Sequence, residues 1–336
     1  MRILYVRNLN QVAEIQAHEL ARRNHLVKLC EPNLAGDHAP LPVKLAMMPG
    51  RLLSLRHITR DLSPRHFDLV HIHWATYGIL GLASRIPFIV ECHGSDVRYR
   101  LRQPFFRSVL ASIFHRAAGV HCITPELLPI VQSVHPDARF IPGPVDTDRF
   151  TPAEESQSSA TRPWTVLLFS RLDPVKGPEI ATAGIARFAQ RHPDVRVQLL
   201  DWGLLKEQYK QRYGKRFEFI PLVRPEKVQH LIWSADVIVG QCFLGILSFC
   251  ELQAMSCAKP VICSFHYHSA YPTPPPLCEA TTAEEIDAHL EHLFQHPEVG
   301  TSVGQEAREW VIRNHDYRLL SARLEKIYQS IVQVKQ

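Results

Sequence analysis

The sequence lacks several patterns that would assign it to well-known classes of protein. Its eight cysteines form no C-x-x-C pair and lie mostly within apolar runs, which argues against a disulfide scaffold or thiolate zinc site and favours reduced, buried thiols. The longest apolar stretch, residues 237–250, contains Gln241 and is too short to span a bilayer. No zinc-finger, homeodomain or RNA-recognition pattern is present, so we expect no nucleic-acid partner.

Charge is unevenly distributed along the chain. Residues 1–150 carry 18 Lys and Arg against 12 Asp and Glu, whereas residues 151–336 carry 20 against 21. A basic N-terminal half favours an anionic partner, either an acidic acceptor molecule or the surface of a membrane. Met1 leads directly into the strand-like residues 3–6, so we expect no signal peptide and a cytoplasmic protein, peripheral at the inner membrane face if a membrane is the partner.

Short apolar strand patterns alternate with amphipathic helical patterns along the whole chain. Strands are expected at residues 3–6, 27–31, 69–73, 87–92, 119–123, 138–142, 165–170, 195–201, 217–220, 237–240 and 260–264. Such alternation predicts parallel strands covered by helices on both faces, and eleven strands fit two doubly wound sheets better than one. The polar segment 151–163 is the expected linker between domains 1–150 and 164–315, and an amphipathic helix is expected near the C-terminus, at about 317–333.

Two cations follow the strand pattern that begins the second half. Arg171 and Lys176 stand in Leu168-Phe-Ser-Arg-Leu-Asp-Pro-Val-Lys-Gly177, between the end of a strand and the start of a helix. Free backbone N–H groups and the helix dipole favour anions at such a position, and the two cations suit a diphosphate. A surface turn with two solvated cations is the alternative, and this segment alone does not decide between them.

Six motifs in order resemble the retaining glycosyltransferases of family 4, which have the GT-B fold. They are Asp68-Leu-Val-His-Ile-His-Trp74, His93-Gly-Ser-Asp96, Ile141-Pro-Gly-Pro-Val-Asp-Thr-Asp-Arg-Phe150, Arg171-Leu-Asp-Pro-Val-Lys-Gly177, Ala235-Asp-Val-Ile-Val239 and Gln253-Ala-Met-Ser-Cys-Ala-Lys-Pro-Val-Ile262. The resemblance implies two Rossmann-like domains facing a cleft, with the C-terminal helix, residues 316–336, crossing back onto the N-terminal domain. It also implies transfer of a sugar from a nucleotide-diphosphate sugar with retention of configuration. No cofactor and no metal at the diphosphate are then expected, and Arg171 and Lys176 would hold that diphosphate.

The resemblance also places His93 beside the reacting sugar. Asp96 would then either orient the His93 ring or cap the segment that follows. His71 and His73 are expected to point to opposite faces of their strand. His71 would lie in the core, and His73 and Trp74 would either pack or line the acceptor pocket.

The sequence departs from the family at the glutamate pair E-x7-E, which is expected to bind the donor sugar and the ribose. Gln253 occupies the second position and can still hydrogen-bond to hydroxyls. Gly245 occupies the first position, so the sugar contact would come from backbone N–H groups near Ile246 and Leu247, or from Glu251. However, Ser248-Phe-Cys-Glu251 is also a capping-box pattern, and we favour the cap for Glu251.

Further candidates lie on the acceptor side of the N-terminal half. Relatives often have a glycine pair after the first strand, where this chain has Arg7-Asn-Leu-Asn-Gln11. Asn8 and Asn10 would either contact ligand through their amides or form a turn. Arg98 begins a segment rich in arginine and aromatic residues that would either be a solvated helix start or bind an anionic acceptor or lipid head groups.

Three functions remain open at this point. The favoured one is an active retaining glycosyltransferase with a nucleotide-sugar donor and an acceptor that is anionic or lipid-linked. The missing glutamates favour a nucleotide-sugar-binding pseudoenzyme that acts as a partner subunit, whereas the presence of His93, Arg171 and Lys176 argues against it. A sugar epimerase of the same fold is the third.

Overall fold

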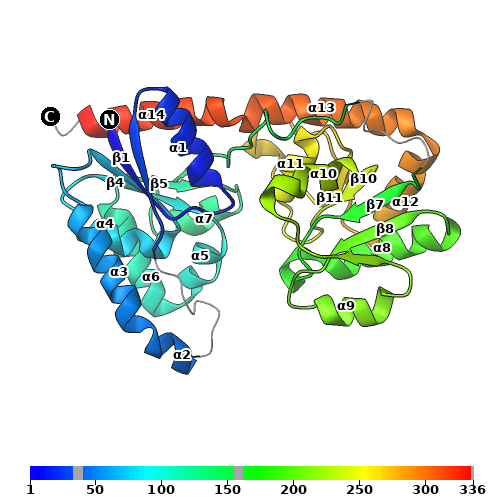
Figure 1. Ribbon diagram of the computed structural model, residues 1–336, viewed down its shortest axis with the longest axis horizontal. Coiled ribbons are helices and arrows are strands. Elements are labelled where there is room, and N and C mark those ends of the chain that lie inside the picture. The colour runs from blue at the N-terminus through cyan, green and yellow to red at the C-terminus, as the bar shows by residue number, and fades with distance from the viewer. Residues whose placement is uncertain (33–40, 155–161, 334–336) are drawn as a thin grey trace. The chain divides into compact units, whose positions relative to one another are not determined.

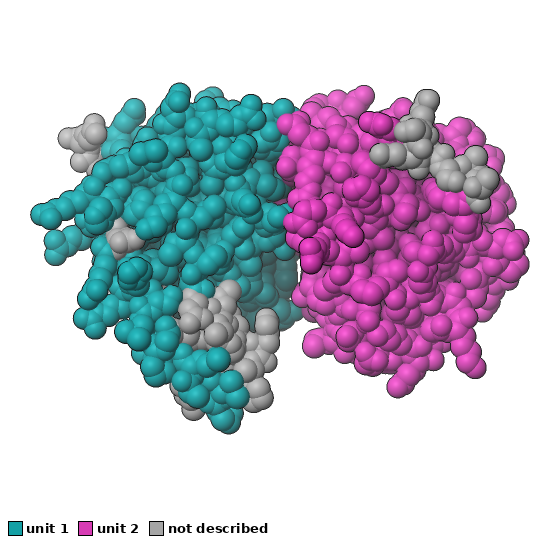
Figure 2. All heavy atoms as spheres, viewed as in Figure 1, with its two compact units in different colours: residues 1–144, 317–336 teal, residues 145–316 magenta. Residues whose placement is uncertain are grey.

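The computed structural model describes residues 1–32, 41–154 and 162–333, and it divides the chain into two compact units (Figures 1 and 2). The first unit comprises residues 1–144 and 317–336, and the second comprises residues 145–316. The chain therefore passes from the first unit to the second between residues 144 and 145, earlier than the expected domain boundary at residue 150. Most of the expected linker, residues 155–161, lies outside the described residues.

The first unit is a sheet of parallel strands with helices on both faces (Figure 1). Its elements are β1 (Arg2–Val6), α1 (Val12–Arg22), β2 (Leu26–Cys30), α2 (Leu41–Ala46), α3 (Met48–Asp61), β3 (Leu69–His73), η1 (Ala75–Gly78), α4 (Ile79–Leu82), β4 (Phe88–Cys92), α5 (Ser95–Arg98), η2 (Arg100–Arg102), α6 (Pro104–Arg116), β5 (Gly119–Cys122), α7 (Leu127–Gln132), β6 (Arg139–Phe140) and α14 (Tyr317–Gln333).

The strands of this sheet lie in the order β2-β1-β3-β4-β5-β6, and each pair of neighbouring strands is parallel. The order reverses between β1 and β3, and their carboxyl ends therefore flank the point at which doubly wound sheets bind ligands.

Apolar side chains cover both faces of the first sheet. Leu4, Val6, Val70 and other strand residues pack against the α3, α4 and α6 side, while Ile3, Tyr5 and Leu69 face the opposite side. The C-terminal helix α14 closes that second side with Leu324 and Tyr328, both fully buried. The apolar spacing of residues 317–333 predicted such a buried face, and α14 packs against α1 within the first unit.

The second unit repeats this architecture (Figure 1). Its elements are β7 (Thr165–Leu168), η4 (Pro174–Lys176), α8 (Pro178–Arg191), β8 (Arg196–Leu200), α9 (Lys206–Tyr213), β9 (Glu218–Ile220), η5 (Pro225–Lys227), α10 (Val228–Trp233), β10 (Val237–Val239), α11 (Phe249–Ser256), β11 (Val261–Cys263), η6 (His268–Ala270), β12 (Cys278–Glu279), α12 (Ala283–Gln295) and α13 (Pro297–His315).

Its six strands lie in the order β12-β11-β10-β7-β8-β9, again all parallel, and the order reverses between β7 and β10. The predicted class, two doubly wound parallel sheets, is therefore confirmed. The sequence did not predict β12, because its two residues are too short to show a strand period. Among the described residues, no helix combines the length and the apolar character that crossing a membrane requires.

Close packing of two helices supports the second sheet. Gly184 of α8 lies against α12, where an added Cβ would stand 2.6 Å from the Ala283 carbonyl oxygen and 2.7 Å from Ile286 Cβ. No real Cβ tolerates such contacts, so the sequence needs glycine at this helical position despite its low helix propensity.

We therefore predict that Gly184→Ala destabilises the second unit. Overpacking of this kind costs about 1–3 kcal/mol, which lowers the melting temperature of a unit of this size by about 2–10 °C. Gly300→Ala is the matched control, because its nearest new contacts are 3.6 Å away and Ala favours a helix. Scanning calorimetry measures both variants, and equal melting temperatures for the two would contradict the packing argument.

Candidate active site

The two predicted diphosphate ligands lie at the switch point of the second sheet. Arg171 and Lys176 follow β7, and the segment 240–248 follows β10, the neighbouring strand. The Cys242 N–H donates to the Lys176 carbonyl at 2.9 Å, and a Cβ on Gly177 would stand 3.0 Å from the Cys242 backbone. Gly177 has φ +67° and begins α8, so the two strand ends and the start of a helix meet here.

Both cations also lie near the start of α11. Burial raises the pKa of the Cys250 thiol in the first turn of α11 to about 12, Glu251 adds to this, and Lys176 and Arg171 act in the opposite direction. The Arg171 side chain is 42% exposed, lies 3.2 Å from Asp173, and holds its guanidinium 5.2 Å from the centre of the Trp202 ring. An anion here would meet the two cations and the helix start that the sequence predicted, and also the N-terminus of α11.

Gly245 has a neighbour that the sequence analysis missed. Its φ is +65°, and a Cβ built on it would stand 2.3 Å from Nδ1 of His266. The exposed His266 ring therefore occupies the space that a side chain at residue 245 would need, and the His266 N–H donates to the Gly245 carbonyl. The side chains of Ile246 and Leu247 are buried, so a ligand there would meet backbone groups.

The structure shows Glu251 to be a capping residue. It is fully buried, forms the capping box of α11 with Ser248, and accepts from the Gln241 N–H at 2.8 Å. The predicted cap is therefore confirmed, and no oxygen of this carboxylate is left for a sugar. Gln253 lies two residues after Glu251 and is half-buried. Unlike the Glu251 carboxylate, its amide has no hydrogen-bond partner in the part of the chain that the structure describes.

The second unit also begins with an Asp-x-Asp sequence, Asp146-Thr147-Asp148, which the expectation of a metal-free diphosphate site overlooked. Two of its residues make hydrogen bonds within the protein. Asp146 accepts from the Arg149 N–H at 3.0 Å, and the Thr147 hydroxyl donates to Asp316. Asp146 thus caps the turn that follows β6.

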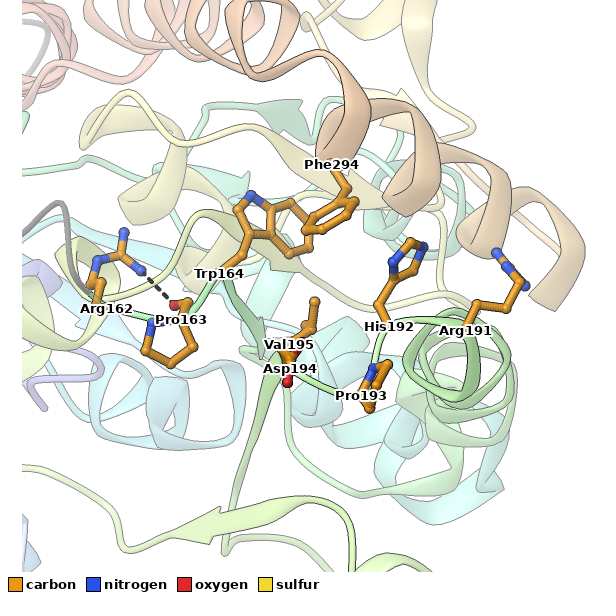
Figure 3. Close-up of a pocket in the computed structure, with 9 residues that line it drawn as sticks. All are labelled: Arg162, Pro163, Trp164, Arg191, His192, Pro193, Asp194, Val195 and Phe294. Atoms are coloured by element: carbon orange, nitrogen blue, oxygen red, sulfur yellow. Dashed lines mark hydrogen bonds between the residues drawn. The ribbon is translucent and has the colours of Figure 1, made fainter.

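A hollow in the second unit lies away from these residues (Figure 3). Its lining residues include Trp164 and Asp194, from the segments that directly precede β7 and β8, and Phe294 of α12. Ligands of doubly wound sheets bind at the carboxyl ends of strands, whereas this hollow lies at the amino ends. It is therefore a poor candidate for a donor site.

In the first unit, the loop after β1 adopts conformations that glycine usually supplies. Arg7, Asn10 and Gln11 have φ of 73°, 50° and 63°. Asn8 is hydrogen-bonded within the protein, because its backbone N–H donates to Glu31 and its side-chain amide pairs with Glu14. Asn10, in contrast, is exposed to solvent. Non-glycine residues in this region store strain that is common at functional sites.

Trp74 ends the neighbouring strand β3 and also has a positive φ, 104°. The Arg7 guanidinium lies over its ring at 4.6 Å from the centroid, within the range of a cation–π interaction. Arg98 pairs with Glu126 and is 15% exposed, so the structure commits it to an ion pair rather than to a free anion site.

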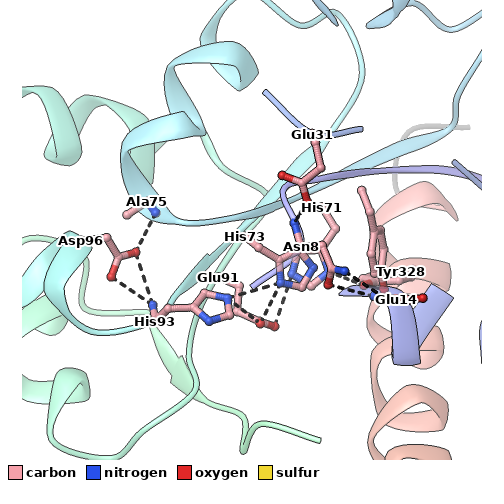
Figure 4. Close-up of polar contacts among 11 residues, drawn as sticks. Asn8, Glu14, Glu31, His71, His73, Ala75, Glu91, His93, Asp96 and Tyr328 are labelled. Carbon is pink, nitrogen blue, oxygen red and sulfur yellow. Dashed lines mark hydrogen bonds and ion pairs between the residues drawn. The ribbon is translucent and has the colours of Figure 1, made fainter. Parts of the chain in front are cut away.

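The expectation that His71 and His73 point to opposite faces was wrong. Residues two apart on a strand share a face, and the two rings stack with centroids 4.5 Å apart. Both are fully buried and lie beside Glu91 of β4, which the sequence analysis did not single out (Figure 4). The available signal was a carboxylate in the apolar run 88–92, two residues before His93.

His93 belongs to the same buried group. Its side chain is 4% exposed, and its Nε2 lies 3.1 Å from Glu91 Oε1 and 3.3 Å from His73 Nδ1. Asp96 neither orients that ring nor caps α5 through its side chain. Its carboxylate accepts from the backbone N–H groups of His93, Gly94 and Ala75 and thereby joins two loops (Figure 4). Asp96 is therefore a positioning residue.

Comparisons with known proteins agree with this geometry. Residues 9–149 match the family described as Glycosyltransferase Family 4. A phosphatidyl-myo-inositol mannosyltransferase of Mycobacterium tuberculosis is 24% identical, over 96% of this chain and 91% of that protein. A D-inositol 3-phosphate glycosyltransferase of Pseudarthrobacter chlorophenolicus is 24% identical, over 68% of this chain and 62% of that protein.

Solved structures show the same fold. Anabaena HepE in complex with UDP-glucose superposes with a TM-score of 0.74 at 16% identity, covering 98% of this chain and all of that chain. Sucrose-phosphate synthase of Thermosynechococcus elongatus superposes with a TM-score of 0.77 at 16% identity, covering 99% of this chain and 100% of that chain.

Two six-stranded parallel sheets with ligand-type residues at their carboxyl edges define a GT-B protein. Together with the sequence relatives, this fold supports a glycosyltransferase that uses a nucleotide-sugar donor. The resemblance of its motifs to glycosyltransferase family 4 is therefore supported by the family match over residues 9–149 and by the glycosyltransferases among its relatives.

Proposed function

We propose that this glycosyltransferase transfers a sugar with retention of configuration and uses no metal ion at the donor diphosphate. The observation that carries the proposal is the placement of Arg171 and Lys176 between β7 and α8, where both act electrostatically on Cys250 in the first turn of α11. Retention is supported by the resemblance to family 4 retaining enzymes, because the residue geometry alone does not distinguish the two stereochemical outcomes.

The chemistry needs a stable leaving group. When the bond between the sugar C1 and the diphosphate oxygen breaks, negative charge develops on the diphosphate, the acceptor oxygen bonds to C1, and the proton of the acceptor hydroxyl passes to the departing diphosphate. Fixed cations and helix N-termini stabilise this charge without reorganising, which lowers the barrier. Arg171 supplies a guanidinium fork, Lys176 a point charge, and the partner-free amide of Gln253 a contact for ribose hydroxyls.

We propose that the acceptor binds to the first unit and carries a phosphate, as the names of inositol-phosphate and phosphatidylinositol glycosyltransferases among the relatives suggest. The backbone of the His93–Gly94 turn would face the reacting sugar, since the His93 ring is turned toward Glu91. The exposed Asn10 and the Arg7–Trp74 pair at the switch point would contact the acceptor.

A membrane contact through the first unit is also proposed. On α3, Leu52 and Leu53 are 57% and 66% exposed, and Arg56 and Arg60 continue the same surface at helical spacing. Exposed apolar residues next to arginines suit the boundary between anionic head groups and acyl chains.

One experiment separates this function from its alternatives. Purified chain is incubated with nucleotide sugars and inositol-phosphate lipid acceptors in the presence of EDTA, and the product anomer is determined by NMR. Retained configuration in EDTA supports the proposal. Inverted product or strict dependence on added divalent cation contradicts it, donor binding without turnover favours a pseudoenzyme, and acceptor-free release of an epimerised sugar favours an epimerase.

The diphosphate contact predicts that Arg171→Ala and Lys176→Ala each lower kcat/KM about 10–200-fold, since each removes a charge-assisted contact worth about 1.5–3 kcal/mol. Arg187→Ala is the matched control, an exposed arginine of α8 that pairs with Glu284. Steady-state transfer assays compare the three variants. Wild-type turnover in both diphosphate variants would show that the donor binds elsewhere.

The ribose contact predicts different outcomes for two substitutions of Gln253. Gln253→Glu should alter nucleotide affinity by no more than about tenfold, because a stronger acceptor is opposed by charge repulsion from the diphosphate. Gln253→Leu should weaken binding by more than that, because ribose hydroxyls would lose their partner. Calorimetric titration with the nucleoside diphosphate measures both, and unchanged affinity in the Leu variant would mean that Gln253 only packs.

The membrane contact predicts that the double variant Leu52→Ser, Leu53→Ser loses vesicle binding. Burying each leucine contributes about 1.5–3 kcal/mol, so we expect at least a tenfold weaker partition. Leu204→Ser is the control, because Leu204 is 85% exposed in the second unit. Sedimentation with phosphatidylglycerol vesicles tests the three proteins, and equal binding by wild type and the double variant would exclude α3 as the contact.

A further inference from the structure

A buried carboxylate without a cation lies under the carboxyl edge of the first sheet. Glu91 is 1% exposed, and no lysine or arginine pairs with it among the described residues. A buried carboxylate that no cation pairs with is costly when ionised, and a bound metal ion would offset that cost.

Three candidate ligand atoms converge at this carboxylate (Figure 4). Glu91 Oε1 lies 3.1 Å from His73 Nδ1 and 3.1 Å from His93 Nε2, and the two nitrogens are 3.3 Å apart. Metal–ligand bonds of about 2.0–2.1 Å in a tetrahedral site separate neighbouring ligand atoms by about 3.3 Å. The observed triangle has these dimensions.

Hydrogen bonding alone leaves the group incomplete. In the contact between His73 Nδ1 and His93 Nε2, one ring nitrogen donates its proton to the other, so that proton is not donated to Glu91. Glu91 Oε1 then has no hydrogen-bond partner in proper geometry, although it is buried. Unpaired buried acceptors are rare in folded proteins and call for a ligand.

His71 extends the set toward the C-terminal helix. Its Nε2 lies 3.5 Å from Glu91 Oε2, and one ligand atom from each of His71, His73 and Glu91 can be chosen within 4.8 Å of the others. Its Nδ1 hydrogen-bonds to the Tyr328 hydroxyl, which pairs with the Tyr5 hydroxyl at 2.8 Å. Metal-bound histidines usually have such a partner at the second ring nitrogen, which fixes the ring.

We propose that His73, His93 and Glu91, with His71 as the fourth ligand, bind one divalent transition-metal ion, and that this ion is Zn²⁺ under ordinary conditions. Zinc binds imidazole nitrogen and carboxylate oxygen, and a fourth protein ligand closes the tetrahedral site. The ion neutralises Glu91 and ties the carboxyl end of β3 to that of β4, directly under the His93–Gly94 turn. A proton shared among the same side chains, with no metal, is the competing explanation.

This site is separate from the donor diphosphate, since all four ligands belong to the first unit and Arg171 and Lys176 belong to the second. A fully liganded, buried ion offers no open position for a phosphate, and brief exposure to EDTA in an assay does not remove it. The proposal therefore stands or falls independently of the transfer reaction.

The test is the metal content of the full chain. Protein purified without a metal-affinity tag and dialysed against EDTA is analysed by inductively coupled plasma mass spectrometry. We expect about one zinc per chain, released to a colorimetric indicator only on unfolding in guanidinium. X-ray absorption at the zinc edge should show nitrogen and oxygen ligands without sulfur. Folded wild type with less than about 0.1 transition metal per chain, or sulfur ligation by the free cysteines, overturns the proposal.

Variants locate the ion. Glu91→Gln keeps the shape but removes the charge and should reduce zinc to below about 0.2 per chain, as should His73→Asn. His121→Asn is the matched control, a buried histidine on the adjacent strand β5 that lies outside the ligand set, and should retain zinc. Circular dichroism verifies folding of each variant. Full zinc content in a folded Glu91→Gln protein would also contradict the site.

Discussion

Parallel pairing of strands is the constraint on which the rest of this structure depends. Every connection in a parallel sheet must cross back, so all strands end at the same edge, and helices begin there with unpaired N–H groups. The reversal of strand order between β7 and β10 separates their crossover helices at that edge. Arg171, Lys176 and the loop around Gly245 are neighbours for this reason, although about 70 residues of sequence lie between them.

The two units handle charge at this edge in different ways. In the second unit, the cations are partly exposed and lie near helix N-termini, so they remain available to a ligand. In the first unit, the carboxylate of Glu91 lies beneath the edge, surrounded by imidazoles, and the positive φ of Arg7 and Trp74 strains the loops above. An exposed cation is free to pair with an anion from solution, whereas a buried anion is costly without a partner.

The sequence predicted the elements well because they depend on local patterns. Apolar periodicity predicted the strands and α14, and it also predicted that Arg171 and Lys176 lie between the end of a strand and the start of a helix. Single side chains were harder. Asp96 matched a capping position but accepts from three backbone groups, and Glu251 matched both a ligand and a cap until its burial decided the matter.

By itself, the sequence determined the fold class and the resemblance to glycosyltransferase family 4, because periodicity and short motifs are properties of neighbouring residues. Only the tertiary structure decided that His71, His73, Glu91 and His93 form one buried group, and that His266 fills the space beside Gly245. These contacts join separate strands and loops. Their distances depend on register and packing between segments that no local pattern records, and they set both the charge and the space at each site.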